Sequence, residues 1–294
     1  MQIGPFTVDV LSEGTMMLDG GAVFGGLPRT AWESRLPPDP QHRVPLEIRQ
    51  VLVRRPGVNL LIDTGFGEKV SPQIRSLYGL GKLRSWQERL GPLGLAPEDI
   101  THVVFTHLHL EHAGGATRYA ESGEELVPMF PRARHYVQES EWKDACVPNE
   151  RSRAAYRFED FLPLQHESQV QMVAGDQEII EGVRVQLTGG HTRGHQIVIV
   201  GTREQSLFVT GDLIPTRHHV SPAWLAPGDQ SPQDLLESRK SLLRRLLQMP
   251  EHVLLTAHDR GTTPVRVSGS LESLQIAEPG QASTPCGVEL PLAV

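Results

Sequence analysis

Four side chains that bind metal ions well lie within six consecutive residues, directly after the apolar run Val103-Val104-Phe105. The segment from Thr106 to Gly115 reads Thr-His-Leu-His-Leu-Glu-His-Ala-Gly-Gly, and the four side chains are His107, His109, Glu111 and His112. Neutral imidazole and carboxylate are the ligands that Zn²⁺ and similar borderline metals select. The alternative is a His-rich turn in solvent, but four such residues at the end of an apolar strand favour a metal site.

The spacing of these residues indicates more than one metal position. A strand would hold His107, His109 and Glu111 on one side, because alternate side chains point the same way. His112 breaks this alternation, so it can face the cluster only where the strand turns into a loop or helix. We therefore expect two adjacent metal positions.

Three further strand ends supply ligand-type residues. His191 follows the alternating run Val183–Leu187, Asp212 ends the run that begins at Phe208, and His258 follows the run 253–257. Each residue alone is weak support, because a lone His or Asp after a strand is usually a cap or turn residue. Together they indicate one site, since open α/β sheets place their sites at the carboxyl ends of strands.

At this point the chain resembles the metallo-β-lactamase superfamily of metal hydrolases over about residues 5–260. The family pattern is His-x-His-x-Asp-His, followed by a distant His, a bridging Asp and a last His. The matching residues here, which the resemblance implies as metal ligands, are His107, His109, Glu111, His112, His191, Asp212 and His258. Asp63, in Leu61-Ile-Asp-Thr-Gly65, matches a family Asp that orients a metal-bound imidazole. His195 is expected to brace its loop by a hydrogen bond rather than to act in catalysis.

The resemblance also implies the fold and the chemistry. The expected fold is α/β, a four-layer αββα sandwich of two mixed β-sheets flanked by helices. The expected cofactors are two divalent metal ions, zinc before manganese, iron or cobalt, bridged by Asp212 and a solvent molecule. Such ions lower the pKa of water toward neutrality and provide hydroxide as the nucleophile. Asp212 and Glu111 are the expected catalytic residues, and the chain contains no Gly-x-Ser-x-Gly elbow that would suggest a serine nucleophile.

Two positions depart from the family pattern. Glu111 stands where the family has Asp, and its extra methylene predicts a second metal that binds more weakly than the first. The sequence around residues 19–28 and 213–224 resembles the lactonase and methyl-parathion-hydrolase-like branch, which acts on lactones, esters or phosphotriesters. Typical acyl-homoserine lactonases of that branch carry a Tyr three residues after the bridging Asp, whereas this chain has Pro215.

The substrate pocket is predicted from the same two segments. Residues 19–28 are rich in glycine and read as a mobile loop that carries one exposed aromatic residue, Phe24. The segment after Asp212 should run along the pocket mouth, where His218, His219 and Trp224 are candidate lining residues. A core position for Trp224 is nearly as well supported.

Hydrophobic periodicity predicts nine strands and a long helix. The helix begins at Ser231-Pro232 and carries a leucine stripe to Met249-Pro250. A second helix is expected over Glu139–Ala145, with short helical turns within 72–90. The expected strands are Phe6–Leu11, Glu47–Val53, Val58–Ile62, His102–Thr106, Arg134–Gln138, Val183–Leu187, Gln196–Val200, Leu207–Thr210 and Val253–Thr256.

Length and composition indicate an ordinary globular protein. With 294 residues, 38% of them hydrophobic, the chain can bury a substantial core. We expect one domain over residues 1–260 and a loosely held C-terminal tail over 261–294. The N-terminus has no basic start followed by an apolar region, and no membrane-length apolar run occurs, so we expect a cytoplasmic protein.

The net charge and the cysteine content limit the classes of partner that we expect. The net charge of −7 argues against nucleic acid as a partner. Cys146 and Cys286 match no disulfide or zinc-thiolate framework. We expect a small-molecule substrate and no membrane partner, and a homodimer remains open.

Four other functional classes compete with this interpretation. A β-lactamase is disfavoured because such enzymes are secreted and this N-terminus does not predict a signal peptide. A nuclease is disfavoured because the chain lacks a basic surface. A mono-iron sulfur dioxygenase acting on persulfide is a real alternative, because it needs only the first set of ligands. A non-catalytic metal-binding or sensor protein is the last alternative.

Overall fold

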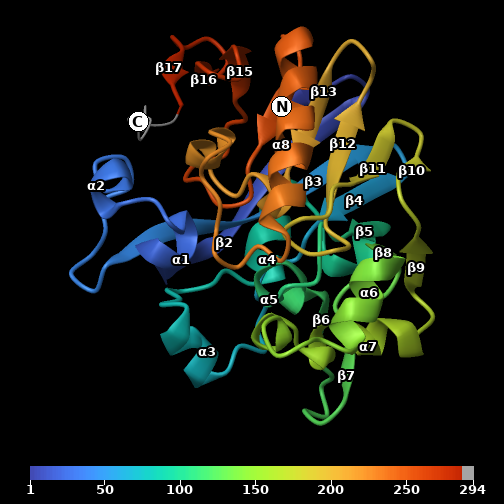
Figure 1. The fold of residues 1–294 in the computed structure, drawn as a ribbon. Coiled ribbons are helices and arrows are strands. Elements are labelled where there is room, and N and C mark those ends of the chain that lie inside the picture. The colour runs from blue at the N-terminus through green and yellow to red at the C-terminus, as the bar shows by residue number, and fades with distance from the viewer. Residues whose placement is uncertain (287–294) are drawn as a thin grey trace.

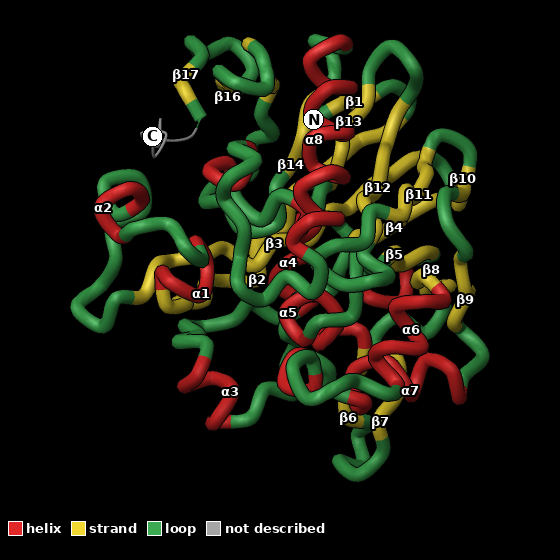
Figure 2. The backbone as a smooth tube through the Cα atoms, viewed as in Figure 1, coloured by secondary structure: helices red, strands yellow, loops and turns green. Residues whose placement is uncertain are grey.

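Two β-sheets lie face to face at the centre of the molecule, and helices cover the outer face of each (Figures 1 and 2). The structure is a computed structural model, and it describes residues 1–286. Valine and isoleucine side chains from both sheets meet in the central layer, including Val8, Val53, Ile62, Val185 and Val198. This arrangement is the expected four-layer αββα sandwich.

The first sheet has seven strands in the order β1-β2-β3-β4-β5-β8-β9 and is mixed. The neighbours from β1 to β4 pair antiparallel, whereas β4, β5, β8 and β9 run parallel, so these four carboxyl ends meet at one edge. The bounds are β1 (Gln2–Ile3), β2 (Phe6–Asp19), β3 (Arg43–Arg55), β4 (Val58–Ile62), β5 (His102–Val104), β8 (Arg134–Gln138) and β9 (Val170–Val173).

The second sheet has five strands in sequence order and is also mixed. Its last pair, β13 and β14, is parallel, and the others are antiparallel. The bounds are β10 (Gln177–Ile180), β11 (Val183–Leu187), β12 (Gln196–Gly201), β13 (Ser206–Val209) and β14 (Val253–Leu255). The alternating pattern of β11 buries Val183 and Val185 against the first sheet, as half-buried strands do.

Helices form the two outer layers. Trp86 of α4 (Trp86–Leu90), Trp142 of α6 (Glu139–Cys146) and Phe161 of α7 (Phe158–His166) pack on the outer face of the first sheet. Helix α8 (Pro232–Gln248) covers the second sheet with the buried side chains Leu235, Leu242, Leu243 and Leu246 of the predicted leucine stripe.

Shorter elements complete the description. The remaining α-helices are α1 (Gly20–Phe24), α2 (Arg29–Trp32), α3 (Pro72–Leu77) and α5 (Leu110–Ala113). Six 3₁₀-helices span Gly91–Leu93, Pro97–Asp99, Gly114–Ala116, Arg153–Ala155, Gly211–Leu213 and Arg217–Val220. Two small sheets hold β6 (Thr117–Tyr119) with β7 (Leu126–Pro128), and β15 (Arg266–Gly269) with β16 (Leu274–Ala277) and β17 (Thr284–Pro285). Within residues 1–286, no helix is both long enough and apolar enough to cross a membrane.

Two expectations about flexible segments are wrong. Residues 20–24 form helix α1, because the side chain of Asp19 accepts hydrogen bonds from the backbone N–H groups of Gly21 and Ala22 and caps it. Residues 261–286 are packed rather than loose, since Val265, Val267, Leu274 and Ile276 are buried in one cluster with the leucines of α8. The division of the chain at residue 260 stays a prediction, and residues 287–294 of the predicted tail lie outside the described residues.

Candidate metal centre

The histidine-rich segment leaves the first sheet before its first histidine. Strand β5 ends at Val104, and the backbone N–H of Thr106 donates to Asp63 Oδ1 at 2.7 Å instead of continuing the strand. Helix α5 then begins, with the backbone N–H groups of His112 and Ala113 both donating to the carbonyl of His109. The expectation that a strand holds His107, His109 and Glu111 on one side is therefore wrong, because a loop and a helical turn present these residues.

The structure brings His107, His109 and His191 together. Their ligand nitrogens all lie within 4.8 Å of one another, and His109 Nδ1 is 3.1 Å from His191 Nε2. All three residues are buried. Burial, reinforced by neighbouring imidazoles, lowers the pKa values of His107 and His109 well below the usual value, so both are neutral donors at pH 7. Burial alone would lower the pKa of His191, but the carboxylates of Asp212 and Asp229 raise it, so this residue would give up a proton when a metal binds. Three imidazoles at this separation suit one zinc-like ion.

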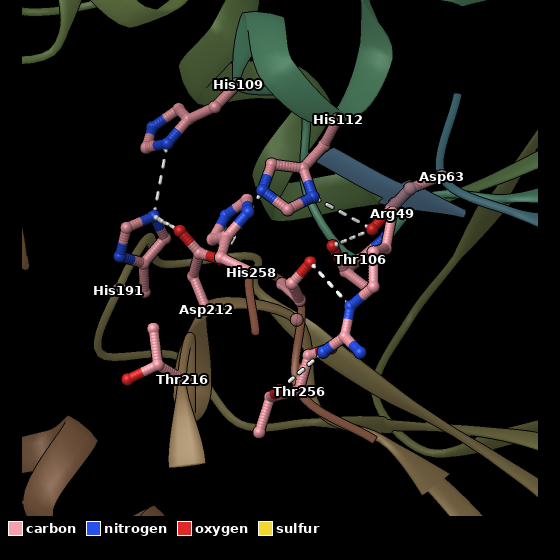
Figure 3. A network of polar contacts seen from close by, with 12 residues as sticks. Arg49, Asp63, Thr106, His109, His112, His191, Asp212, Thr216, Thr256 and His258 are labelled. Atoms are coloured by element: carbon pink, nitrogen blue, oxygen red, sulfur yellow. Dashed lines mark hydrogen bonds and ion pairs between the residues drawn. The ribbon is translucent and has the colours of Figure 1, made fainter. Parts of the chain in front are cut away.

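A second cluster adjoins the first through Asp212. His107, His112 and Asp212 also place their ligand atoms within 4.8 Å of one another. Asp212 Oδ1 lies 3.4 Å from His112 Nε2 and 3.2 Å from His258 Nε2, and Asp212 Oδ2 lies 3.4 Å from His191 Nε2. Figure 3 shows His109, His112, His191 and His258 around this carboxylate. Asp212 therefore directs Oδ1 toward His112 and His258, and Oδ2 toward His191.

The residues present fit two divalent ions. Within residues 1–286, His107 Nε2, His112 Nε2, His258 Nε2 and Asp212 Oδ1 are buried atoms without a hydrogen-bond partner. Leaving such a group buried and unpaired costs about 1–3 kcal/mol. Because these atoms converge on one point, a cation that accepts an electron pair from each of them would remove this cost. Burial alone would raise the pKa of Asp212, but the imidazoles of His112, His258 and His191 hold it well below its usual value. Asp212 is therefore a carboxylate, the form that binds a metal.

Glu111 stands apart from both clusters. Its carboxylate belongs to neither group of closely spaced ligand atoms found among the described residues. Its Oε2 atom is nevertheless buried without a hydrogen-bond partner, and the residue lines the cavity above the clusters. Its role as a metal ligand stays a prediction.

Asp63 and His195 each contact one of the candidate metal ligands. Asp63 Oδ2 lies 2.9 Å from His112 Nδ1 and also accepts a hydrogen bond from the hydroxyl of Thr106. Asp63 adopts a φ of 58°, a backbone conformation rare for residues with side chains, where the chain turns after β4. His195 Nε2 accepts a hydrogen bond from the backbone N–H of Asp212 at 3.0 Å. Burial lowers the pKa of His195 well below the usual value, which keeps this nitrogen an acceptor.

Sequence reasoning missed Glu141, a buried carboxylate on α6. Its Oε1 accepts hydrogen bonds from the backbone N–H of Leu108 (2.9 Å) and the hydroxyl of Tyr156 (3.0 Å), and its Oε2 accepts one from Thr192 (2.5 Å). Leu108 lies between two histidine ligands and Thr192 follows a third, so this carboxylate fixes both ligand loops. Nothing near Glu141 in the sequence signals this contact.

Other missed residues support His191 and His258. Asp229 Oδ1 lies 2.9 Å from His191 Nδ1. The Nδ1 of His258 pairs with the backbone carbonyl of Glu47 at 2.9 Å. Arg49 hydrogen-bonds Thr256 and the carbonyls of Ala257 and Gly261, which anchors the loop that carries His258 (Figure 3). These partners lie far away in the sequence, and only a structure could reveal them.

A cavity of about 230 Å³ opens above the clusters. His109, Glu111, His191, Asp212 and His258 line one part of it. Strands β2 and β3 and helix α1 contribute the apolar lining residues Met16, Leu18, Ala22, Val23 and Leu46. Arg151, Ser152 and Gln230 add polar groups, and Pro215 is also part of the lining.

The predicted pocket residues lie elsewhere. Phe24 and Trp224 are fully buried, and their ring centroids are 5.3 Å apart in a T-shaped contact, so the expectation of an exposed Phe24 is wrong. His219 is buried beside them, with Nε2 3.0 Å from the carbonyl of Val23. His218 lines a neighbouring cavity that shares Leu46 and His258 with the first. None of the four is among the residues that line the cavity above the clusters, and the short helix α1 turns Phe24 into the core.

Comparisons with known proteins agree with this geometry. The family model described as "Metallo-beta-lactamase superfamily" matches residues 44–258. N-acyl homoserine lactonase AttM from Rhizobium radiobacter is 28% identical over 222 residues, which cover 71% of this chain and 80% of the relative. A probable metal-dependent hydrolase from Staphylococcus aureus superposes with a TM-score of 0.85 at 25% identity, covering 99% of this chain and all of that one. AidC, described as a dizinc quorum-quenching lactonase, shares the fold with a TM-score of 0.74 at 17% identity over 96% and 97% of the two chains.

Proposed function

Because this chain belongs to the metallo-beta-lactamase superfamily of metal-dependent hydrolases, we propose that it hydrolyses a small lactone or ester. The centre would hold two divalent ions, with zinc as the first choice. The observation that carries the proposal is the convergence of unpaired, buried His and Asp ligand atoms beneath a cavity with an apolar wall. The relatives named N-acyl homoserine lactonase support a lactone with an acyl tail as the substrate class.

The residues divide into two metal sites. His107, His109 and His191 would hold the first ion, and His112, His258 and Asp212 the second, with Asp212 offering one oxygen to each. When bound, the ions would polarise the substrate carbonyl and supply ionised water as the nucleophile near neutral pH. Imidazoles lie on both sides of the Asp212 carboxylate. This arrangement supports two metal ions rather than the single iron of a sulfur dioxygenase.

We also assign Glu111 a part in the reaction. Its unpaired Oε2 atom and its place in the cavity lining support a role in passing a proton to the leaving alcohol. A carboxylate acts in this way when it lies within hydrogen-bond reach of the reacting oxygen.

The cavity supports a substrate with one polar and one apolar part. Apolar side chains from β2, α1 and β3 would bury the tail, at a gain of about 25 cal/mol per Å² of apolar surface removed from water. Arg151, Ser152 and Gln230 offer donors to a polar head. Pro215 lines the cavity at the position where typical acyl-homoserine lactonases carry Tyr, so the phenol group of those relatives has no counterpart at this position.

A substrate panel tests the proposal. Zinc-loaded protein would be assayed with N-acyl homoserine lactones of short and long chains, simple lactones, aryl esters and a phosphotriester. We expect turnover of lactones or esters, with kcat reduced by about 100-fold or more in Asp212→Asn, because loss of a group that only orients a metal ligand already costs about 10–100-fold. Asp234→Asn, which alters an exposed carboxylate on α8, should behave like the parent.

The panel also discriminates the alternatives. Absence of turnover by a fully metal-loaded protein would contradict the proposal and favour a metal-binding or sensor role. Oxygen consumption with a persulfide, by protein that holds one iron per chain, would instead identify a sulfur dioxygenase.

A further inference from the structure

Asp229 is a buried carboxylate whose two oxygens have separate partners. Oδ1 lies 2.9 Å from His191 Nδ1, and Oδ2 accepts a hydrogen bond from the backbone N–H of Ala226 at 2.9 Å. Asp229 is only 2% exposed. Because both oxygens act as acceptors, an ionised Asp satisfies both donors, and a neutral Asn would satisfy only one.

The segment that carries Asp229 is fixed at several points. The backbone N–H groups of Gln230 and Ser231 donate to the carbonyls of His191 and Gly190, at 3.0 and 2.8 Å. The guanidinium of Arg151 donates to the carbonyls of Pro227 and Asp229, at 2.6 and 2.9 Å. The hydrogen bonds of Gln230 and Ser231 therefore connect this segment directly to the His191 loop.

The same segment forms part of the cavity wall. Ala226, Gly228 and Gln230 line the cavity above the metal ligands, and so does Arg151. Asp229 alternates with these residues and faces His191 behind the wall.

We propose that Asp229 is a positioning residue for the first metal site, and that the segment 226–230 links this site to the substrate cavity. When the His191 ring is neutral and donates its Nδ1–H to Asp229, its lone pair is on Nε2, the atom that lies 3.1 Å from His109 Nδ1 and faces the site. Such a carboxylate fixes the tautomer and ring orientation of a ligating imidazole and increases its basicity. The inference rests on the proposed metal centre and is independent of which substrate is hydrolysed.

Metal affinity tests the proposal. The Zn²⁺ dissociation constant of the tight site would be measured by competition with a chromophoric chelator for the parent, Asp229→Asn and Asp234→Asn. We expect the affinity to fall about 10–100-fold in Asp229→Asn. Asp234→Asn makes the same charge change five residues away on an exposed side chain, and it should leave the affinity unchanged. Equal affinities in the parent and Asp229→Asn, or equal losses in both variants, would overturn the proposal.

A second measurement needs no variant. In the zinc-loaded parent with ¹⁵N-labelled histidine, His191 should carry its proton on Nδ1, and this proton should exchange slowly with solvent. A proton on Nε2 would contradict the proposed contact even if Asp229→Asn failed to fold. Both measurements are independent of turnover, so an inactive protein on the substrate panel would leave their outcome intact.

Discussion

Asp212 combines two properties that rarely occur in one buried side chain. It is surrounded by protein, yet the imidazoles around it hold its pKa well below the usual value. Its two oxygens face different histidines, and its backbone N–H is held by His195. At the scale of single residues, the centre therefore depends on a carboxylate that stays charged because imidazoles that can carry positive charge surround it.

Glu111 gives the sharpest prediction at this scale. Its carboxylate belongs to neither ligand cluster of the described residues, whereas the shorter Asp of the family pattern would bind the second ion. We therefore expect Glu111→Asp to raise the occupancy of the second metal and kcat together. Metal per chain after dialysis and kcat on one lactone would be measured for parent and variant. Two tightly held ions in the parent, with no gain in the variant, would show that the longer side chain is a competent ligand.

The candidate ligands and one supporting carboxylate, Asp63, could be predicted from the sequence, but the supporting carboxylates Glu141 and Asp229 could not. His107, His191 and Asp212 stand at the ends of apolar runs, and this position is visible in a single chain. Glu141 and Asp229 act through contacts 33 and 38 residues away along the chain. No local spacing encodes such contacts, because they arise only when separate loops pack together.

At the scale of elements, strands were predicted better than the short segments between them. The bounds of β4, β8 and β11 match the expected ranges, because their apolar runs are bounded by turn residues. Helix α1 was mistaken for a loop, since two glycines begin it and lower its helix propensity. Tertiary packing compensates, with the Phe24 ring against Trp32, His219 and Trp224.

The burial of Phe24 predicts a stability effect. Phe24→Ala should lower the free energy of unfolding by about 3–5 kcal/mol, the usual cost of removing a buried aromatic ring. Phe158→Ala is the matched control, because that ring is 49% exposed and should cost less. Denaturant unfolding of both variants provides the comparison. An unchanged stability of Phe24→Ala, with a raised KM for long-chain lactones, would instead restore the pocket role expected from the sequence.

At the scale of the whole molecule, the centre joins the two sheets. Asp63, which contacts His112, follows β4 of the first sheet, and Asp212 and His258 follow β13 and β14 of the second. Ions held here would add a further link to the valine-rich layer and to the hydrogen bonds that Glu47 and Arg49 of β3 make with the loop after β14. Metal binding should therefore stabilise the packing of one sheet on the other.

Removing the metal tests this connection. Bound ions stabilise the native state by about 2.7 kcal/mol at a free concentration 100 times the Kd. We expect chelation to lower Tm by several degrees and added Zn²⁺ to restore it, as measured by differential scanning calorimetry. His109→Ala should show a smaller response to the chelator, and Asp234→Asn the full response. A Tm that does not change with chelation would mean that the centre contributes nothing to the cohesion of the sheets.

The position of His258 has a consequence for biosynthesis. This residue follows the last strand of the second sheet, and its partner strand β13 was made before the whole of α8. A nascent chain still lacks one imidazole of the second site after β13 and Asp212 have left the ribosome. The two-metal centre can therefore be completed only after translation has passed residue 258, when nearly the whole sandwich is available to fold.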